Sequence, residues 1–230
     1  GDEVITQAFN FIATVEAILD CGAVPVIANV DSSLNMAVDD LKSLITNKTK
    51  AVLPVHMLGV SANMKEILKI AKEHGIPVIE DNCESIGAKY NGQSLGTLGQ
   101  VGAISFDQGK MLATGEGGMV LTNDAAVSKY ACEYHDHGHE SNPDRPRGRD
   151  THSIYGFNYR MTEMQGAVGK VQLSKLNRML EANKERYQAL EDAMGGKFLL
   201  RTIPEECVPT FDTLILFEPD EYVRKAVIDT

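Results

Sequence analysis

Three polar residues lie where predicted strands end, and their types suggest the chemistry of this chain. Asp81 and Ser105 each end an apolar segment, and Lys110 follows in a loop with glycines on both sides. Open α/β sheets bind their ligands at the carboxyl ends of their strands. A carboxylate placed there can bind a metal, cap a helix or pair with a protonated ring nitrogen.

Lys110 has the most distinctive setting of the three. Taken alone, a loop lysine is expected to be solvated, because lysines are rarely buried. In a dry cleft, however, a lysine amine becomes a nucleophile that can form a Schiff base with a carbonyl compound. The combination with Asp81 and Ser105 favours this second interpretation.

Strands and helices alternate regularly in the first 80 residues. The apolar spacing of Met64, Ile67, Leu68 and Ala71 is typical of an amphipathic helix. Regular alternation predicts an α/β domain with a largely parallel sheet. Strands are predicted at 1–6, 23–30, 50–56 and 77–80, and helices at 13–19, 38–45 and 63–74.

The pattern changes after residue 82. Asn91-Gly92 predicts a tight hairpin. The polar segment 137–153 is expected to be a long surface loop, and loops of that length are usually functional. Further strands are predicted at 102–106, 118–122 and 213–217, a long helix at 161–194, and a helix start at Asp220.

Composition excludes several classes of protein. With 43% hydrophobic and 23% charged residues the chain is expected to be globular, not disordered. A net charge of −10 disfavours partners such as nucleic acid or an anionic membrane surface. No apolar run is long enough to span a bilayer, and no export signal opens the sequence. Four widely spaced cysteines without a C-x-x-C pair favour reduced thiols, so a cytoplasmic location is expected.

Several motifs, in order along almost the whole chain, carry a family resemblance. They are Gly1-Asp2-Glu3-Val4-Ile5, Pro54-Val55-His56, Val78-Ile79-Glu80-Asp81-Asn82, Ser105-Phe106 through Lys110, Thr114-Gly115-Glu116-Gly117-Gly118 and Gly156-Phe157-Asn158-Tyr159-Arg160-Met161. The chain thereby resembles the DegT/DnrJ/EryC1/StrS family of pyridoxal-phosphate-dependent sugar aminotransferases. The resemblance implies the α/β fold-type-I (aspartate-aminotransferase-like) large domain over residues 1–160, with a mostly parallel central sheet. Residues 161–230 would then be a long connecting helix and the start of a truncated small α/β domain.

The resemblance also implies roles for residues around the cofactor, pyridoxal 5′-phosphate. Lys110 would bind the cofactor covalently. It would then carry protons between the alpha carbon of the substrate and carbon C4′ of the cofactor. Asp81 would pair with the pyridinium nitrogen and keep it protonated, so that the ring can act as an electron sink. Glu84 matches a position near the ring where many members carry glutamine, which leaves its hydrogen bonding open.

Three more residues match cofactor contacts of the family. Ser105 matches a serine that contacts the phosphate. Phe11 matches an aromatic that covers one ring face, although an ordinary core phenylalanine is an equal alternative. Asn158 matches an asparagine that reaches the phosphate from the neighbouring subunit, which implies a homodimer with a shared active site.

The implied reaction is transfer of an amino group, with glutamate as donor, to a keto-sugar. The sugar would be a nucleotide-linked 4-keto-6-deoxyhexose used for cell-surface polysaccharide or deoxyaminosugar biosynthesis. One alternative is a deoxysugar dehydratase, but those relatives replace the lysine with histidine. A second is a non-catalytic binding or regulatory module, against which Lys110 and Asp81 argue. A nicotinamide-binding protein is disfavoured because no G-x-G-x-x-G follows a strand.

Two charged clusters remain open to interpretation. His135, His137 and His139 alternate, but no fourth ligand is evident and histidines are favourable at a helix end, so no metal site is expected. A second cluster is formed by Arg145, Arg147 and Arg149. These arginines are expected to be solvated, with a clamp on an anionic substrate group as the alternative.

Family members have a stretch before the Gly-Asp-Glu-Val-Ile motif, and they continue beyond the residue that matches Thr230. We therefore expect this sequence to be an internal fragment of a longer enzyme. The missing stretch would supply a helix N-terminus for the cofactor phosphate. The 230 residues alone are expected to show little or no aminotransferase activity.

Overall fold

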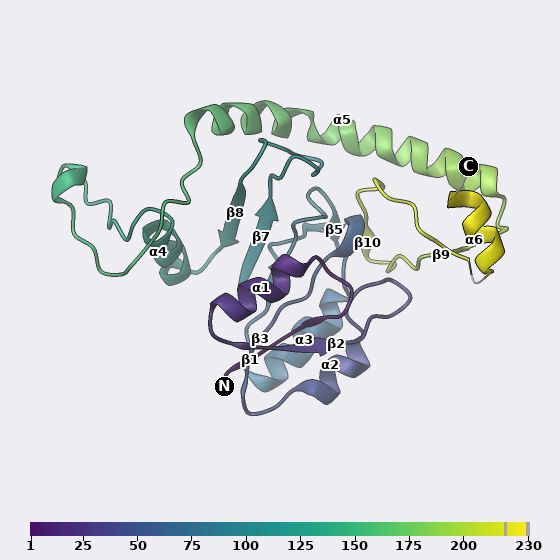
Figure 1. Cartoon of the computed structure of the whole chain (residues 1–230), viewed down its shortest axis with the longest axis horizontal. Coiled ribbons are helices and arrows are strands. Elements are labelled where there is room, and N and C mark those ends of the chain that lie inside the picture. Colours follow the sequence, from purple (N-terminus) through teal and green to yellow (C-terminus); the bar gives the residue numbers. More distant parts are fainter. Residues whose placement is uncertain (219, 229–230) are drawn as a thin grey trace.

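A computed structural model describes residues 1–218 and 220–228, and its centre is a twisted sheet (Figure 1). Two groups of strands form it, hydrogen-bonded in the orders β2-β1-β3 and β4-β7-β8. Parallel bridges from Val52 to Val78 and from Val55 to Asp81 join β3 to β4, so the two groups make one sheet. The strands are β1 (Glu3–Gln7), β2 (Val24–Ala28), β3 (Thr49–Val52), β4 (Ile79–Asp81), β7 (Val101–Ser105) and β8 (Gly118–Thr122).

The prediction of a mostly parallel sheet is confirmed. β1, β2 and β3 are parallel, as are β4 and β7, whereas β8 runs antiparallel to β7. The strand predicted at 50–56 is shorter than expected, because β3 ends at Val52. The amide of Leu53 still donates to the carbonyl of Ile5 in β1 at 2.7 Å, and further on the amide of His56 donates to the carbonyl of Asp81 at 3.0 Å.

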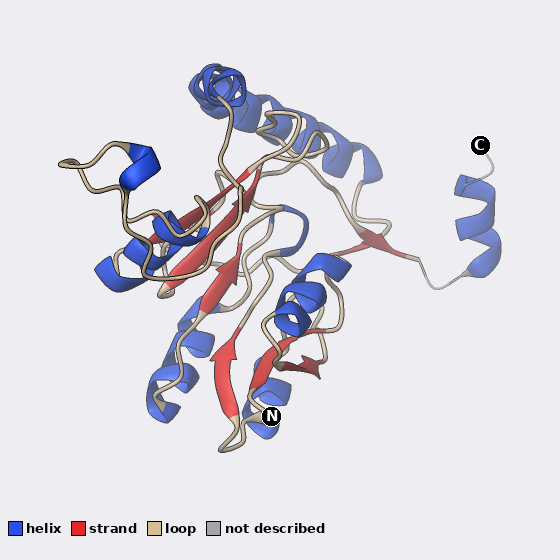
Figure 2. Ribbon diagram, turned by 60° about the vertical axis from the view of Figure 1, so that its left-hand side comes forward, coloured by secondary structure: helices blue, strands red, loops and turns tan. Residues whose placement is uncertain are grey.

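Helices cover both faces of this sheet (Figure 2). The chain steps outward from β1 to β2 and then back past β1 to β3. Because such crossovers are right-handed, the two connecting helices lie on opposite faces. α1 (Ile12–Asp20) packs on β1 and β2, and α2 (Val38–Leu44) and α3 (Met64–His74) lie together on the other face. The main core includes Ile5, Met36, Leu41, Val52, Met64, Ile67 and Ile70.

The predicted hairpin at Asn91-Gly92 is confirmed. β5 (Lys89–Tyr90) and β6 (Gln93–Ser94) pair antiparallel on either side of it. Both turn residues have positive φ, 49° and 77°, the geometry that matches the twist of a two-residue hairpin.

A long helix passes over the carboxyl end of β7 and continues beyond it (Figure 1). This helix, α5 (Glu163–Met194), begins at a capping box between Thr162 and Gln165. The Gln165 side chain also donates to the carbonyl of Glu116 at 2.8 Å, which ties the start of the helix to the loop before β8. None of the helices in the described ranges is long and apolar enough to cross a membrane.

The segment after α5 returns to the sheet domain. Cys207 joins the main core, and its strand pairs antiparallel with β5. The boundary between two domains at residue 160 stays a prediction. The remaining elements are η1 (Met57–Gly59), α4 (Ala125–Tyr134), η2 (Arg147–Arg149), β9 (Leu199–Leu200), β10 (Cys207–Val208), β11 (Leu216–Phe217) and α6 (Glu221–Ile228).

A buried, hydrogen-bonded carboxylate fixes the carboxyl end of β4. The Glu80 carboxylate is fully buried and accepts from His56 Nε2 at 2.9 Å and from the amide of Gly96 at 2.8 Å. The amides of Leu98 and Gly99 donate to its other oxygen at 2.6 Å each. Burial alone would raise the pKa of Glu80, but the His56 hydrogen bond and the backbone donors hold it below its usual value. The role of His56 is therefore structural.

Glu80→Gln should destabilise the protein, because a buried amide cannot accept four donors and its own NH2 would face another donor. We expect the free energy of unfolding at pH 7 to fall by about 3 kcal/mol. Since the pKa of Glu80 is lowered, the difference from wild type is present above its ordinary value of 4.5 and shrinks as the pH falls. Urea unfolding of the full-length protein at several pH values measures this. Equal stability of Glu80→Gln and the exposed control Glu73→Gln would contradict it.

Candidate active site

The carboxyl end of β4 places Asp81 beside the first turn of α1. The hydroxyl of Thr14, a buried residue of that turn, donates to Asp81 Oδ2 at 2.8 Å. The amide of Cys83 donates to Oδ1 at 3.1 Å. Each oxygen keeps a free lone pair, so the carboxylate is oriented and can still accept from a ligand. No local sequence signal predicted this contact, because its two residues lie 67 positions apart in the chain.

Lys110 and Glu84 form the second part of the site. Lys110 Nζ lies 3.4 Å from Glu84 Oε1, and the amide of Leu58 donates to Oε2 at 3.2 Å. The two side chains are 24% and 19% exposed, so the pair is screened from water more than a surface pair is. They line a cavity of about 150 Å³ together with Leu58, Cys83, Ile86, Gly109, Met111, Asp212 and Thr213.

Cys83 adds no charge to this cavity. Burial raises the pKa of its thiol, and the neighbouring carboxylate of Asp81 raises it further. The thiol is therefore protonated at neutral pH.

Ser105 and Phe11 lie at the ends of the adjoining elements. Ser105 is the last residue of β7, the strand next to β4, and its hydroxyl accepts from the amide of Asp107 at 3.2 Å. Phe11 immediately precedes α1, and its carbonyl accepts from the amide of Thr14 at 3.1 Å. Because Phe11 is 66% exposed, the alternative that it is a core phenylalanine is wrong.

Asn158 lies in the loop between α4 and α5, which extends past the outer side of β8 (Figure 1). Its Oδ1 accepts from Arg160 Nε at 2.9 Å, and its backbone bridges to Asp136. The structure joins it to this loop and brings it into no contact with the cavity of Lys110.

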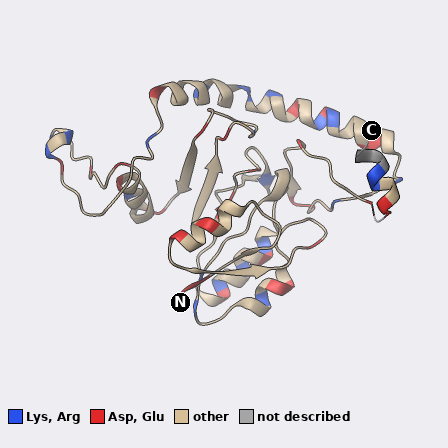
Figure 3. Cartoon of the chain, in the orientation of Figure 1, with Lys and Arg blue, Asp and Glu red and all other residues tan. Residues whose placement is uncertain are grey.

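The expectation that all three arginines of this loop are simply solvated is wrong for Arg147, which pairs with a carboxylate of the chain. Arg147 donates from both terminal nitrogens to both oxygens of Asp136, and Arg160 Nε lies 3.3 Å from the same carboxylate. The hydrogen bond from Arg147 lowers the pKa of Asp136 to about 2. The ion pair of Arg147 with Asp136, called the latch below, thus holds the loop against the end of α4. Arg145 and Arg149 are exposed in the arginine-bearing end of the loop (Figure 3).

The histidines of this region have separate surroundings. His135 Nδ1 bonds to the carbonyl of Cys132 at 2.6 Å. The ring of His139 contacts that of His152, with centroids 4.2 Å apart and the ring planes tilted by 48°. Within the described residues no cluster of three or more His, Cys, Asp or Glu side chains is arranged to hold a metal ion.

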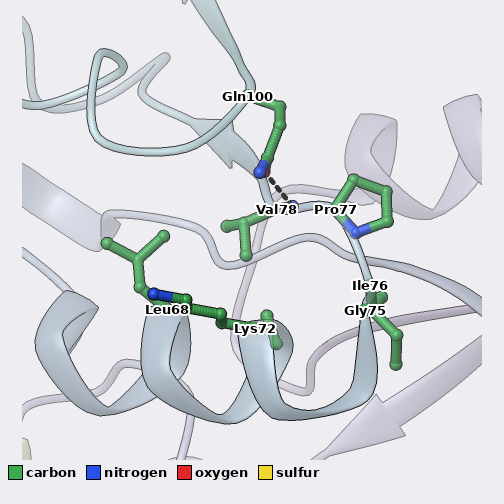
Figure 4. Close-up of a pocket in the computed structure, with 8 residues that line it drawn as sticks. Leu68, Lys72, Gly75, Ile76, Pro77, Val78 and Gln100 are labelled. Carbon is green, nitrogen blue, oxygen red and sulfur yellow. Dashed lines mark hydrogen bonds between the residues drawn. The ribbon is translucent and has the colours of Figure 1, made fainter.

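A larger hollow of about 580 Å³ lies at the opposite, amino end of β4 (Figure 4). Leu68, Pro77 and Val78 make its wall largely apolar. The side-chain oxygen of Gln100 accepts a hydrogen bond from the amide of Val78 at 2.7 Å. Lys72 is its one charged lining residue, so the hollow lacks an acid–base pair. We therefore place the site at the carboxyl ends of the strands.

Comparison with known proteins identifies the family. The model of the DegT/DnrJ/EryC1/StrS aminotransferase family matches residues 1–228. This chain belongs to that family. The resemblance drawn from the sequence motifs is confirmed, as is the fold-type-I α/β class.

Relatives and solved structures of the family give the same picture. GDP-perosamine synthase of Vibrio cholerae is 34% identical over 85% of this chain and 52% of its own length. The aminotransferase structure from Psychrobacter cryohalolentis has a TM-score of 0.85 at 33% identity, over 92% of this chain and 58% of its own. The structure of a GDP-4-keto-6-deoxy-D-mannose-3-dehydratase of Escherichia coli, with bound hydrated pyridoxal phosphate, has a TM-score of 0.89 at 28% identity. The match covers 100% of this chain and 63% of the dehydratase chain. The chain spans about half the length of the curated relatives it matches.

Asp136→Asn should open the loop between α4 and α5, because it removes the charge that holds Arg147. Loss of one charge-assisted hydrogen bond corresponds to about tenfold in the open population. Limited trypsin digestion at residues 145–149 should accelerate by that factor. Since the pKa of Asp136 is near 2, the latch contributes above its ordinary value of 3.8 and weakens only as the pH falls towards 2.

The exposed Asp144→Asn in the same loop is the matched control. Equal digestion rates for the two variants would show that the Asp136 ion pair does not hold the loop.

Proposed function

We propose that the protein containing this chain transfers an amino group to a keto-sugar, with pyridoxal phosphate as cofactor. The observation that carries the proposal is the pairing of an amine with a carboxylate at neighbouring strand ends. Lys110 lines a cavity, and Asp81, oriented by Thr14, accepts from the amide of Cys83 in the wall of that cavity and keeps free lone pairs. Membership of an aminotransferase family supports the same reaction.

The groups present fit this cofactor. A lysine amine suits its aldehyde, a carboxylate suits its ring nitrogen, and hydroxyl and amide donors suit its phosphate. Lys110 and Asp81 supply the first two, and Ser105 at the end of β7 supplies a hydroxyl. When bound, the cofactor supplies an electron sink for the carbon that loses its proton.

The side chains around the cavity bind and orient the reacting groups and transfer the proton. Asp81 holds a proton on the ring nitrogen, and Thr14 fixes the orientation of that carboxylate. Lys110, once free, moves a proton to and from the reacting carbon, which is general acid–base catalysis. Glu84 holds the Lys110 amine in place from the opposite side of the cavity. Phe11 offers an exposed aromatic face one turn before Thr14.

For the substrate we propose a nucleotide-linked 4-keto-6-deoxyhexose, with glutamate as donor. The likeness to GDP-perosamine synthase supports an amino sugar as product. The pathway would be cell-surface polysaccharide or deoxyaminosugar biosynthesis, in the cytoplasm. The likeness to the dehydratase keeps deoxysugar dehydration as a second candidate, but dehydratase relatives carry histidine where this chain has Lys110.

We further propose a homodimer in which the loop of Asn158 reaches the neighbouring site. Two observations support it: the loop extends away from its own cavity, and apolar side chains near it face solvent. Tyr155 is 95% exposed and Met164 is 78% exposed. Val168 and Val171 extend this apolar surface along α5. Exposed apolar surface of this kind is characteristic of protein interfaces.

Lys110→Arg should abolish amino transfer, because a guanidinium keeps the charge opposite Glu84 but forms no Schiff base. We expect turnover of the full-length protein to fall by at least about a thousandfold. Borohydride treatment in the presence of pyridoxal phosphate should label residue 110 of the wild type, seen by peptide mass spectrometry. Near-normal turnover of Lys110→Arg, or labelling only at the exposed Lys89, would exclude this mechanism.

Asp81→Asn should retain the cofactor and lose the charge that holds the ring nitrogen protonated. A charge-assisted bond of this kind is worth several kcal/mol, so single-turnover proton transfer should slow at least about a hundredfold. The exposed Asp20→Asn at the end of α1 serves as control. Unchanged single-turnover kinetics in Asp81→Asn would remove this residue from the mechanism.

A further inference from the structure

Arg201, in the segment after α5, is a buried cation that faces backbone carbonyls. Its side chain is nearly inaccessible, at 5% exposure. Nε donates to the carbonyl of Ser33 at 2.6 Å, Nη2 to Met57 at 2.6 Å and Nη1 to Leu58 at 3.2 Å. No carboxylate of the described residues lies within ion-pair distance of it. Burial lowers the pKa of Arg201 to about 10, so the cation is retained at neutral pH.

The turn that Arg201 contacts has an unusual backbone. Leu58 has φ 49° and ψ 51°, a left-handed conformation that costs a branched residue energy and persists only when its surroundings enforce it. The next residue, Gly59, has φ 80°, and a Cβ there would lie 1.9 Å from Thr210 Oγ1. The amide of Thr210 also donates to the Gly59 carbonyl at 3.0 Å. The segment containing Arg201 and Thr210 thus hydrogen-bonds to this turn and packs against one side of it.

The other side of the same turn faces the site. While the carbonyl of Leu58 accepts from Arg201, its amide donates to Glu84 Oε2 at 3.2 Å. Glu84 Oε1 in turn lies 3.4 Å from Lys110 Nζ. A continuous chain of polar contacts therefore runs from Arg201 through one left-handed residue and one carboxylate to the lysine.

We propose that Arg201 is a positioning residue for Lys110, acting through the Leu58 backbone and Glu84. The Met57 carbonyl and the Leu58 amide belong to one planar peptide group, so the guanidinium that holds this carbonyl orients the amide towards Glu84. Glu84, fixed at one oxygen by that amide, holds the lysine amine with the other. The catalytic meaning of this arrangement rests on the proposed function, but the coupling itself is a property of the folded chain.

Two measurements on the full-length protein without added cofactor test the coupling. Hydrogen exchange of the peptide covering 57–60 reports the Leu58 amide. Acylation by an amine-selective reagent, read by mass spectrometry, reports how tightly Lys110 is held. The variants are Arg201→Lys, which keeps the charge but loses the fork, Glu84→Ala, and the double variant.

Arg201→Lys should raise both the hydrogen-exchange rate of the Leu58 amide and the acylation rate of Lys110 by about tenfold. This is the change expected when one charge-assisted hydrogen bond is lost. In the Glu84→Ala background it should leave Lys110 acylation unchanged, because the link is already broken. Arg186→Lys, exposed on α5, controls for the exchange of cations. Tyr187→Leu, which loosens the packing of the buried Tyr187 on Phe211, controls for general loosening of the segment.

An equal effect of Arg201→Lys with and without Glu84 would overturn the proposal, as would an equal effect of Tyr187→Leu. Absence of borohydride labelling of Lys110 by pyridoxal phosphate in the wild type, with the coupling intact, would instead overturn the proposed function and leave this coupling standing. Intact labelling with no coupling would overturn the positioning role alone.

Discussion

The buried carboxylate of Glu80 accepts hydrogen bonds from two separate segments of the chain, His56 and the loop 96–99, and the geometry of the site follows from it. His56, Gly96 and the amides of 98–99 all converge on that one group. Successive side chains of a strand point to opposite faces, so a fixed Glu80 directs Asp81 towards α1. Four hydrogen bonds offset the cost of burying the charge, and removing them would release strand and loop together.

Polar contacts beyond this strand end hold the side chains of the site in place. Thr14 orients Asp81, and Glu84 holds Lys110, so each reactive group has a partner from a distant part of the sequence. Glu84, Lys110 and the protonated thiol of Cys83 line one cavity, and Asp81 accepts from the amide of Cys83. This arrangement keeps the amine in a defined place while leaving the Asp81 lone pairs available, which is the preorganisation that catalysis requires.

The sequence predicted the elements better than the contacts between them. Regular alternation, the Asn91-Gly92 turn and the apolar helix spacing located most of the strands and helices, because these signals are local. β9, β10 and the extent of α4 were not predicted, and the strand predicted at 213–217 is only Leu216–Phe217. The early end of β3 at Val52 was missed, since it depends on which neighbour the chain pairs with. The buried Arg201, the latch at Arg147 and the exposure of Phe11 were missed for the same reason: partners far along the chain determine them.

The central claim is that Lys110 and Asp81 address two ends of one cofactor. A crystal structure of the full-length protein with pyridoxal phosphate tests it most directly. The account predicts continuous density between Lys110 Nζ and the cofactor, the ring nitrogen within hydrogen-bond distance of Asp81, and the Thr14 contact retained. A cofactor bound elsewhere, or a ring whose nitrogen faces away from Asp81, would contradict the account.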